Sequence, residues 1–371
     1  MQKTRVLVVG GYGFFGRRLV ERLSKQAGLD ITVAGRSREA GESLVRTLQA
    51  SSSSGLHSET MDAMSSAFVN SLRRLSPTVV VNASGPFQGQ DYRVAEACIA
   101  VGSHYIDLAD GREFVTGVGS LNKAAETAGV LVASGASSVP ALSSAVTDHL
   151  VRGLCSVHSI EIGISPGNRT ERGLSTVRGI LSYCGQALPT SSPNATIGWL
   201  GSHRHSYSSP VGSRLLSPCD VPDLVLLPSR YPGQPEVRFA AGLELEALHR
   251  GMNLMAWMAH HRLVNDWSEY AQWLKRAADL FKTWGTDTGA MHVSVQGIAD
   301  DGHLIRRSWE LLAMRGDGPY VPTLAASALI RNISNRSLQT LGATPCLGLL
   351  SLEDFTVEMQ GLDIVTSESA E

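Results

Sequence analysis

A run of glycines near the N-terminus carries the clearest chemistry in this sequence. Gly11, Gly13 and Gly16 come straight after the apolar stretch Val6 to Val9. In this pattern the first glycine allows a tight turn, the second lets backbone amides approach a pyrophosphate, and the third lets the next helix pack close to its strand. The helix N-terminus adds partial positive charge. The spacing predicts a dinucleotide-binding loop made by Gly11, Tyr12, Gly13, Phe14, Phe15 and Gly16.

The residues that discriminate between NAD and NADP are expected about twenty positions after the last glycine, following the strand Ile31 to Ala34. Gly35, Arg36 and Ser37 follow that strand, without the carboxylate that binds a ribose 2′-hydroxyl. A guanidinium binds a 2′-phosphate bidentately and stacks on adenine. Arg36 and Ser37 therefore predict NADP as the cofactor. The alternative is a solvated loop arginine beside a helix N-cap serine.

The same glycines also fit the GxxGxxG spacing of short-chain dehydrogenases. That class requires a tyrosine four residues before a lysine, so that the ammonium lowers the pKa of the phenol. None of the eight tyrosines has a lysine at that position, which excludes this chemistry. The histidines and cysteines show no zinc-like spacing, so no metal site is predicted.

Composition narrows the class of protein. The chain has 371 residues, enough for two domains with large cores. Its formal net charge of −2 gives no long-range attraction to nucleic acid, which is not an expected partner. The five cysteines are widely spaced and lack a CxxC pair, which suits a reducing compartment. No apolar run is long enough for a membrane span, so we expect a cytoplasmic protein.

Strand and helix signals alternate through residues 1–144, which predicts an α/β domain with a doubly wound parallel sheet of the Rossmann type. Residues 145–321 have longer irregular segments and predict a second, α+β domain for substrate binding and dimerisation. Residues 322–371 are expected to return to the first domain. The six predicted strands of the first domain are Val6 to Val9, Ile31 to Ala34, Leu56 to Met61, Thr78 to Val81, His104 to Asp107 and Val130 to Ala133.

Three segments at the carboxyl ends of the later strands are expected to border the nicotinamide half, because open α/β sheets bind ligands at that edge. Asp110 is our candidate for proton transfer. The alternative for Asp107 and Asp110 is a helix cap or a turn former. The segments are Asn82 to Phe87 after the fourth strand, with Ser84, Gly85 and Pro86 as the cofactor contacts, Asp107 to Arg112 after the fifth, and Ser134 to Ser138 after the sixth.

The predicted helix Ala247 to Ala259 is apolar over more than one stripe. Three interpretations stay open: a buried core, a dimer interface, or the wall of an apolar substrate channel. A membrane-surface role is disfavoured, because basic residues do not line a polar face of this helix.

With these residues in hand, the sequence resembles the saccharopine dehydrogenase family over nearly its whole length. The resemblance implies an NADP- or NAD-linked oxidoreductase with a Rossmann domain, a mixed substrate domain and commonly a dimer. The chemistry of the family's namesake is reduction of an imine, or the reverse. The resemblance rests on VLVVGGYGFFGRRLVERL, VVNASGPFQGQDYRVAEACIAVGSHYIDLADGREFV, GASSVPALSSAV, NRTERGLSTVRGILSYCGQ, CDVPDLVLLPSRYPG and RFAAGLELEALH.

One departure from the family pattern bears on the substrate. Saccharopine-forming members carry an acidic residue in a GxDPG run after the sixth strand, where this chain has Gly135 to Val139, reading GASSV. A carboxylate that binds a substrate amino group is lost, so saccharopine is not the expected substrate and an imine remains the family default. The alternatives are a non-catalytic NADP-binding protein and an enoyl reductase for a lipid- or carrier-linked chain. The candidates to bind a substrate carboxylate are Arg172, Arg178 and Arg238. The alternative for each of them is a surface or structural role.

Overall fold

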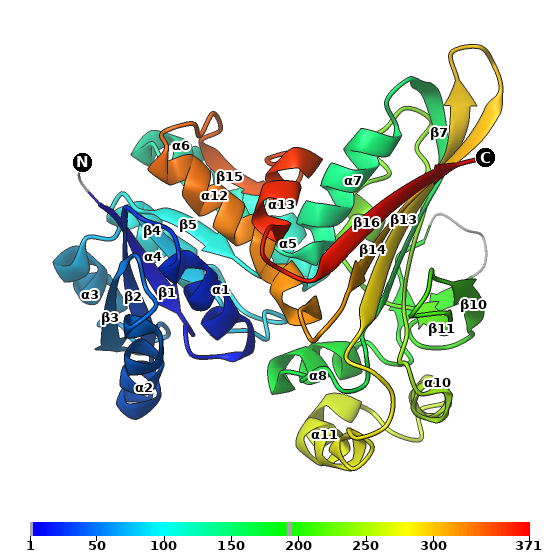
Figure 1. Cartoon of the computed structure of the whole chain (residues 1–371), viewed down its shortest axis with the longest axis horizontal. Coiled ribbons are helices and arrows are strands. Elements are labelled where there is room, and N and C mark those ends of the chain that lie inside the picture. Colours follow the sequence, from blue (N-terminus) through cyan, green and yellow to red (C-terminus); the bar gives the residue numbers. More distant parts are fainter. Residues whose placement is uncertain (1–2, 191–194) are drawn as a thin grey trace. The chain divides into compact units, whose positions relative to one another are not determined.

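The computed structural model describes residues 3–190 and 195–371, which form two compact units (Figure 1). Unit 1 comprises Met1–Leu142 and Tyr320–Glu358, and unit 2 comprises Ser143–Pro319 and Met359–Glu371. None of the helices formed by the described residues combines the length and the apolar character of a segment that crosses a bilayer.

Unit 1 contains a seven-stranded parallel sheet in the order β15-β6-β5-β4-β1-β2-β3. The chain winds outward from β1 to β3, then returns to β4 beside β1 and winds the other way. This confirms the predicted doubly wound sheet, whose ligand edge lies where the winding reverses. The strands are β1 (Thr4–Val9), β2 (Leu29–Gly35), β3 (Gly55–Thr60), β4 (Val79–Asn82), β5 (His104–Asp107), β6 (Leu131–Ser134) and β15 (Gly342–Pro345).

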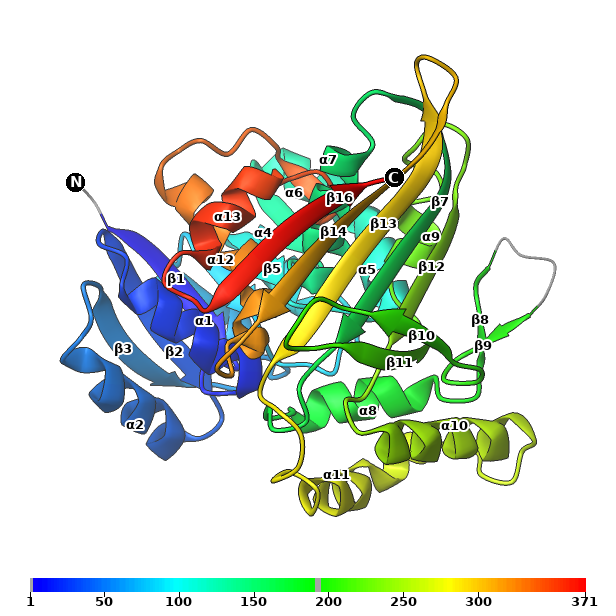
Figure 2. The same cartoon turned by 45° about the vertical axis from the view of Figure 1, so that its right-hand side comes forward.

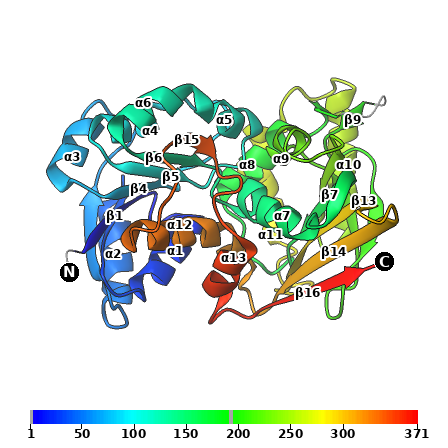
Figure 3. The ribbon, with the colours of Figure 1, turned by 90° about the horizontal axis from the view of Figure 1, so that it is seen from above.

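Helices cover both faces of this sheet, with α1, α2 and α12 on one face and α3, α4 and α6 on the other (Figure 3). The central strands are accordingly apolar at consecutive positions: Val79, Val80 and Val81 of β4 are all fully buried. The helices are α1 (Phe14–Ser24), α2 (Arg38–Gln49), α3 (Phe68–Leu75), α4 (Arg93–Ala100), α5 (Arg112–Gly117), α6 (Asn122–Ala128), α12 (Leu324–Ser334) and α13 (Leu352–Met359).

Unit 2 is built on a mixed seven-stranded sheet in the order β10-β11-β12-β7-β13-β14-β16 (Figure 2). β12 and β7 pair in parallel, and the hairpin predicted over residues 291–311 is present as antiparallel β13 and β14. The main strands are β7 (Leu154–Ser165), β10 (His203–Ser206), β11 (Ser213–Pro218), β12 (Glu236–Ala241), β13 (Gly289–Ala299) and β14 (Leu304–Ala313). The helices are α7 (Ser143–Leu150), α8 (Leu174–Ser182), α9 (Asp223–Leu226), α10 (Glu246–His260) and α11 (Ala271–Asp279).

The C-terminal segment is divided between the two units, so the prediction that all of residues 322–371 return to the first domain is wrong. α12 and β15 do join unit 1, whereas β16 (Ile364–Ala370), red in Figure 1, pairs antiparallel with β14 of unit 2. Six of its seven residues are exposed, so its pairing depends on main-chain hydrogen bonds to an open sheet edge. Such an edge strand leaves no hydrophobic signal in the sequence.

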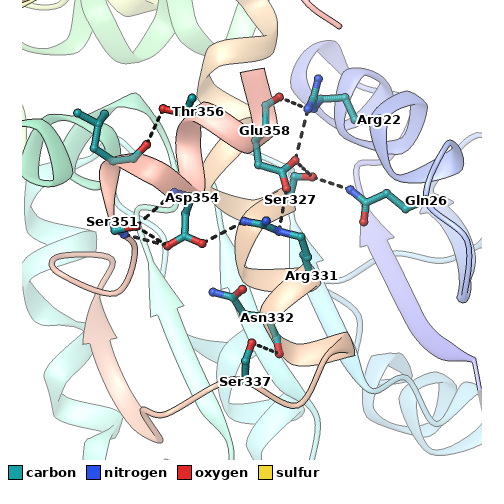
Figure 4. Close-up of polar contacts among 11 residues, drawn as sticks. Arg22, Gln26, Ser327, Arg331, Asn332, Ser337, Ser351, Asp354, Thr356 and Glu358 are labelled. Atoms are coloured by element: carbon teal, nitrogen blue, oxygen red, sulfur yellow. Dashed lines mark hydrogen bonds and ion pairs between the residues drawn. The ribbon is translucent and has the colours of Figure 1, made fainter. Parts of the chain in front are cut away.

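A buried carboxylate, Glu358 of α13, ties three helices of unit 1 together (Figure 4). Its side chain is only 4% exposed and accepts a hydrogen bond of 2.6 Å from Ser327 of α12. The guanidinium of Arg22 in α1 lies 3.3 Å from it, and that of Arg331 in α12 lies 3.2 Å from it. Arg331 also pairs with Asp354 of α13 at 3.0 Å, so two guanidinium groups face two carboxylates, and the network fixes α12 and α13 against α1.

Replacing Glu358 by alanine should therefore destabilise unit 1. The change leaves two partly buried guanidinium groups without their shared anion, and we expect a loss of about 3 kcal/mol in the free energy of unfolding. The control is Glu42→Ala, which breaks the exposed pair with Arg38 and should leave stability unchanged. Urea unfolding followed by circular dichroism measures both variants. Equal, small effects would contradict a structural role for this network.

Candidate functional site

The turn between β1 and α1 has the geometry of an anion site. Gly10 adopts a φ of +72°, in the left-handed region that favours glycine, and its carbonyl accepts a hydrogen bond of 2.8 Å from the Gly13 N–H. α1 starts at Phe14 with Gly13 as its N-cap, and no side chain caps it. The first N–H groups of a helix carry partial positive charge, so an uncapped start is ready to bind a phosphate.

Helix α1 also approaches the turn too closely for any side chain at Gly16. A Cβ there would overlap the carbonyl oxygen of Gly10 and lie 2.9 Å from the Cα of Gly11. A Cβ at Gly11 would lie 2.8 Å from the Val8 carbonyl oxygen. The two glycines are therefore required by backbone packing, which holds the helix start at the carboxyl end of β1.

At the end of β2, Tyr12 holds the segment predicted to bind the 2′-phosphate. The Ser37 N–H donates a hydrogen bond of 2.7 Å to the Tyr12 hydroxyl. The tyrosine ring fits there because Gly35 has no side chain: a Cβ at that position would lie 2.6 Å from ring carbons of Tyr12. The sequence motif did not reveal this contact, because it joins residues 25 positions apart.

Arg36 and Ser37 occupy different positions within that segment. The Arg36 side chain is exposed and forms no ion pair with any residue between 3–190 or 195–371. Ser37 is the N-cap of α2, since its hydroxyl accepts a hydrogen bond of 3.2 Å from the Ala40 N–H. The capping alternative considered for Ser37 is thus present in the structure. A cap hydroxyl still has a proton to donate, so capping does not exclude a phosphate contact.

The loop after β4 contains Ser84, Gly85 and Pro86 and lies against the glycine turn: a Cβ at Gly10 would be 3.1 Å from the backbone of Ala83 and Ser84. Asn82, buried at the end of β4, anchors this loop. Its Oδ1 atom accepts hydrogen bonds from the Ser84 N–H, at 3.1 Å, and from the Ser84 hydroxyl. No local sequence pattern indicates this anchoring role of Asn82.

Asp107 and Asp110 follow β5 but differ in their surroundings. Asp107 is fully buried, and one of its oxygens accepts hydrogen bonds from Ala109 N–H at 3.0 Å, the Ser134 hydroxyl at 3.0 Å and Gly135 N–H at 2.8 Å. Burial raises the pKa of Asp107 to about 6, against these hydrogen bonds, which lower it. Asp107 therefore organises the ends of β5 and β6.

Asp110 is only partly buried, and its Oδ1 accepts a hydrogen bond of 3.3 Å from the Gln88 amide. Burial raises the pKa of the Asp110 carboxyl, while the bond from Gln88 lowers it. A raised pKa favours the neutral acid, which is the form that a proton donor needs.

In unit 2, the three arginine candidates lie in unlike settings. Arg238 is exposed and bonds to Glu236 at 2.8 Å, and Arg178 is exposed on α8. Arg172 is partly buried, donates to the Asn168 side-chain oxygen at 3.2 Å, and has its pKa lowered by burial. Arg172 thus retains the strongest case among the three for holding an anion.

A cluster of polar side chains in unit 2 resembles hydrolase chemistry at first sight. The His249 Nε2 atom lies 3.1 Å from the Ser202 hydroxyl and 3.0 Å from the Ser217 hydroxyl. However, the Leu243 N–H donates to Nδ1 at 3.4 Å, so the ring proton is on Nε2 and His249 is a donor to these serines. Burial lowers the pKa of His249 to about 4. The cluster is a buried hydrogen-bond network and contains no general base for a serine.

The fold and this site define a two-unit protein with a Rossmann unit built to bind a dinucleotide. Residues 6–133 match the family model described as the saccharopine dehydrogenase NADP binding domain. Residues 6–133 therefore have the character of a saccharopine dehydrogenase-type NADP-binding domain, and the prediction of NADP is confirmed at the level of this domain family. No curated protein matches the chain.

One solved structure supports the same fold. The apo saccharopine dehydrogenase (L-Glu forming) of Saccharomyces cerevisiae is 10% identical, with a TM-score of 0.72, covering 99% of this chain and all of that one. An amine dehydrogenase of Mycobacterium smegmatis is also 10% identical and covers 92% of this chain and 94% of that one. Its TM-score of 0.48 is too low to carry an argument. At such identities the likeness shows a common fold for the whole chain and leaves the substrate open.

The pKa of Asp107 predicts how stability depends on pH. A folded-state pKa of about 6, above the ordinary 3.8, means that the stability contributed by the neutral acid is present below pH 4 and lost as the pH rises through 6. About two pKa units correspond to roughly 3 kcal/mol. Asp107→Asn should remove this dependence on pH. Relative to the variant, the wild type should therefore lose roughly 3 kcal/mol in its free energy of unfolding between pH 4 and pH 7.

The control for this measurement is the exposed Asp91, whose pKa is lowered by its hydrogen bond with Arg93. Asp91→Asn should change stability with the opposite sign, because its contribution is lost as the pH falls. A wild-type minus Asp107→Asn difference that does not vary with pH would contradict the burial of an unpaired carboxyl at this site.

Proposed function

We propose that this protein is an NADP(H)-dependent oxidoreductase that transfers hydride to or from a C=N bond of a small substrate. The observation that carries the proposal is the uncapped start of α1 against the glycine turn, in a unit that matches an NADP-binding domain family. The likeness of the fold to a saccharopine dehydrogenase supports the step from NADP binding to oxidoreductase chemistry. The choice of a C=N bond rests on the family resemblance alone.

The residues present fit this cofactor. The first backbone N–H groups of α1, at Phe14, Phe15 and Gly16, would bind the pyrophosphate over the glycine turn, and the exposed Arg36 would bind the 2′-phosphate, with Ser37 beside it. Ser84, Gly85 and Pro86 border the nicotinamide half. Bound NADPH supplies the hydride, and the protein orients it and excludes water.

Arg36→Asp should weaken binding of NADPH by about ten- to a hundredfold and leave binding of NADH unchanged or improved. The physical reason is the loss of one charge-assisted phosphate contact and the gain of a repulsive carboxylate, together worth roughly 1.5–3 kcal/mol. Calorimetric titration of both cofactors measures the effect. Arg46→Asp, on α2, is the control for the change in net charge. Equal losses for both cofactors in Arg36→Asp would show that Arg36 does not discriminate between them.

Asp110 is our candidate for the group that gives a proton to the product nitrogen. Asp110→Asn should lower kcat for reduction by about 100-fold, the ordinary contribution of general acid catalysis, and leave NADPH affinity unchanged. Because burial raises the pKa of Asp110, wild-type kcat should fall as the pH rises through that pKa, and the variant should lose this limb. Asp301→Asn, in an exposed hairpin turn, is the control. An unchanged pH profile in Asp110→Asn would exclude Asp110 as the donor.

The proposed activity is tested by following NADPH oxidation at 340 nm with pairs of a keto acid or aldehyde and an amine, and separately with enoyl thioesters. Turnover with amine pairs alone supports a C=N substrate. Turnover with enoyl thioesters alone would contradict the proposed C=N substrate and would indicate reduction of a C=C bond. NADPH binding without turnover on either class would favour a binding protein.

We also propose that unit 2 binds the substrate and that the protein is a cytoplasmic homodimer, as the family resemblance implies. Light scattering after size-exclusion chromatography gives the mass in solution. A mass equal to one chain would contradict the dimer.

A further inference from the structure

Exposed apolar side chains are concentrated in one short segment of unit 2. Thirteen large apolar side chains are exposed in the described part of the chain, and seven of them lie within residues 254–284. We call these seven the aromatic face, since they include all three exposed tryptophans. Its members are Leu254, Trp257, Leu263, Tyr270, Trp273, Leu280 and Trp284.

The aromatic face follows the outward sides of two helical segments. On α10, Leu254 and Trp257 are three residues apart and lie on one side, while Ala256 and Ala259 on the other side are buried. From α11 onward, Trp273, Leu280 and Trp284 are spaced by seven and four residues and are 70%, 80% and 62% exposed. Leu254 and Trp257 thus lie on the solvent side of α10, and Trp273 is exposed on α11. Leu280 is the C-cap of α11 and Trp284 lies in the turn that follows, so both are exposed beyond the end of the helix.

The segments themselves are held firmly to unit 2, so the exposed rings are not the result of a loose chain. The Trp267 indole N–H, between the two helices, donates a hydrogen bond of 2.8 Å to the Met255 carbonyl of α10. Ala271, at the start of α11, is fully buried, and α11 packs on α8. α10 and α11 lie at the same end of unit 2 in Figures 1 and 2.

Cations accompany the exposed rings. Arg262, Arg276 and Lys282 are exposed and form no ion pair with any described residue, and the Arg276 guanidinium lies 5.5 Å from the centre of the Trp273 ring. Among the acidic groups of the segment, Asp279 is neutralised by Lys275 at 2.8 Å. Residues 254–284 hold four Lys or Arg and three Asp or Glu, a formal charge of +1, whereas the whole chain carries −2.

We propose that the aromatic face docks on an anionic lipid surface. Tryptophan, tyrosine and leucine on one side of a helix, with arginine and lysine beside them, is the composition that settles at the boundary of headgroups and acyl chains. Anionic lipids attract unpaired cations near the surface. This replaces our expectation from α10 alone: the basic residues come from the segment that follows α10.

The electrostatics favour lipid over a second copy of this chain. A two-fold contact through the aromatic face would bring the same surface against itself, with Arg262, Arg276 and Lys282 from both copies in one interface. Such a contact gathers six cations and only four carboxylates, those of Asp266 and Glu269 in each copy, and the excess of positive charge costs free energy. A negatively charged surface matches them directly. The inference does not depend on the proposed enzymatic activity, and either can fail alone.

The test uses the full chain with vesicles of phosphatidylcholine and vesicles that also contain phosphatidylglycerol. We expect the protein to sediment with the anionic vesicles, with a shift of tryptophan emission to shorter wavelength and weaker binding at high salt. The triple variant Trp273→Ser, Leu280→Ser, Trp284→Ser should lower partitioning by at least about tenfold. The control replaces equally exposed leucines elsewhere, Leu304→Ser and Leu341→Ser, and should bind as wild type does.

A second variant, Arg276→Gln with Lys282→Gln, keeps the apolar rings and should lose only the preference for anionic vesicles. Circular dichroism and the Tm confirm that each variant is folded. If the triple variant does not fold, the vesicle binding of the charge variant decides the question. The proposal is overturned if wild type stays in the supernatant with both vesicle types. It is also overturned if partitioning is unchanged in both variants, or if the triple variant only converts a dimer to a monomer.

Discussion

The close approach of α1 to the glycine turn is the constraint on which the rest of unit 1 depends. With no side chain at Gly16, the helix start lies against the Gly10 carbonyl, and the positive end of the helix dipole meets the carboxyl edge of the sheet. The order of the sheet then places the loop after β4 beside the same turn. One backbone contact thereby holds together the start of α1, the glycine turn and the loop after β4, which are the parts of the proposed dinucleotide site.

Other parts of unit 1 hold this arrangement from several sides. Tyr12 fixes the Ser37 segment after β2, Asn82 fixes the Ser84 loop, and Asp107 gathers the ends of β5 and β6. At the back of α1, Glu358 joins the helix to the returning C-terminal helices. The loops that we propose to border the cofactor are thus each held by hydrogen bonds within the protein.

The sequence was sufficient for the features that arise from local patterns. The central strands of unit 1 were predictable because runs such as Val79 to Val81 are buried on both faces, and the β13–β14 hairpin because its turn contains Asp300, Asp301 and Gly302. β15 and β16 were not, since β15 has only four residues and six of the seven residues of β16 are exposed, so neither leaves a clear hydrophobic pattern. The sequence made the apolar character of α10 evident. It did not indicate which side of the helix faces solvent, because that depends on the elements that pack against α10.

The candidate site shows the same division. Glycine spacing predicted the turn, whereas the slot that Gly35 leaves for Tyr12 joins residues remote in sequence. The residue type of Asp107 gave no indication of its complete burial, because three donors from three different positions make that burial tolerable.

The central claim is that the glycine turn and the start of α1 bind the diphosphate of NADP. Isothermal titration calorimetry of the purified wild-type chain with NADPH tests it most directly. The account predicts a saturable heat with one site per chain, which added inorganic pyrophosphate diminishes by competition. Absence of heat with both reduced and oxidised NADP, in a chain shown to be folded, would contradict it.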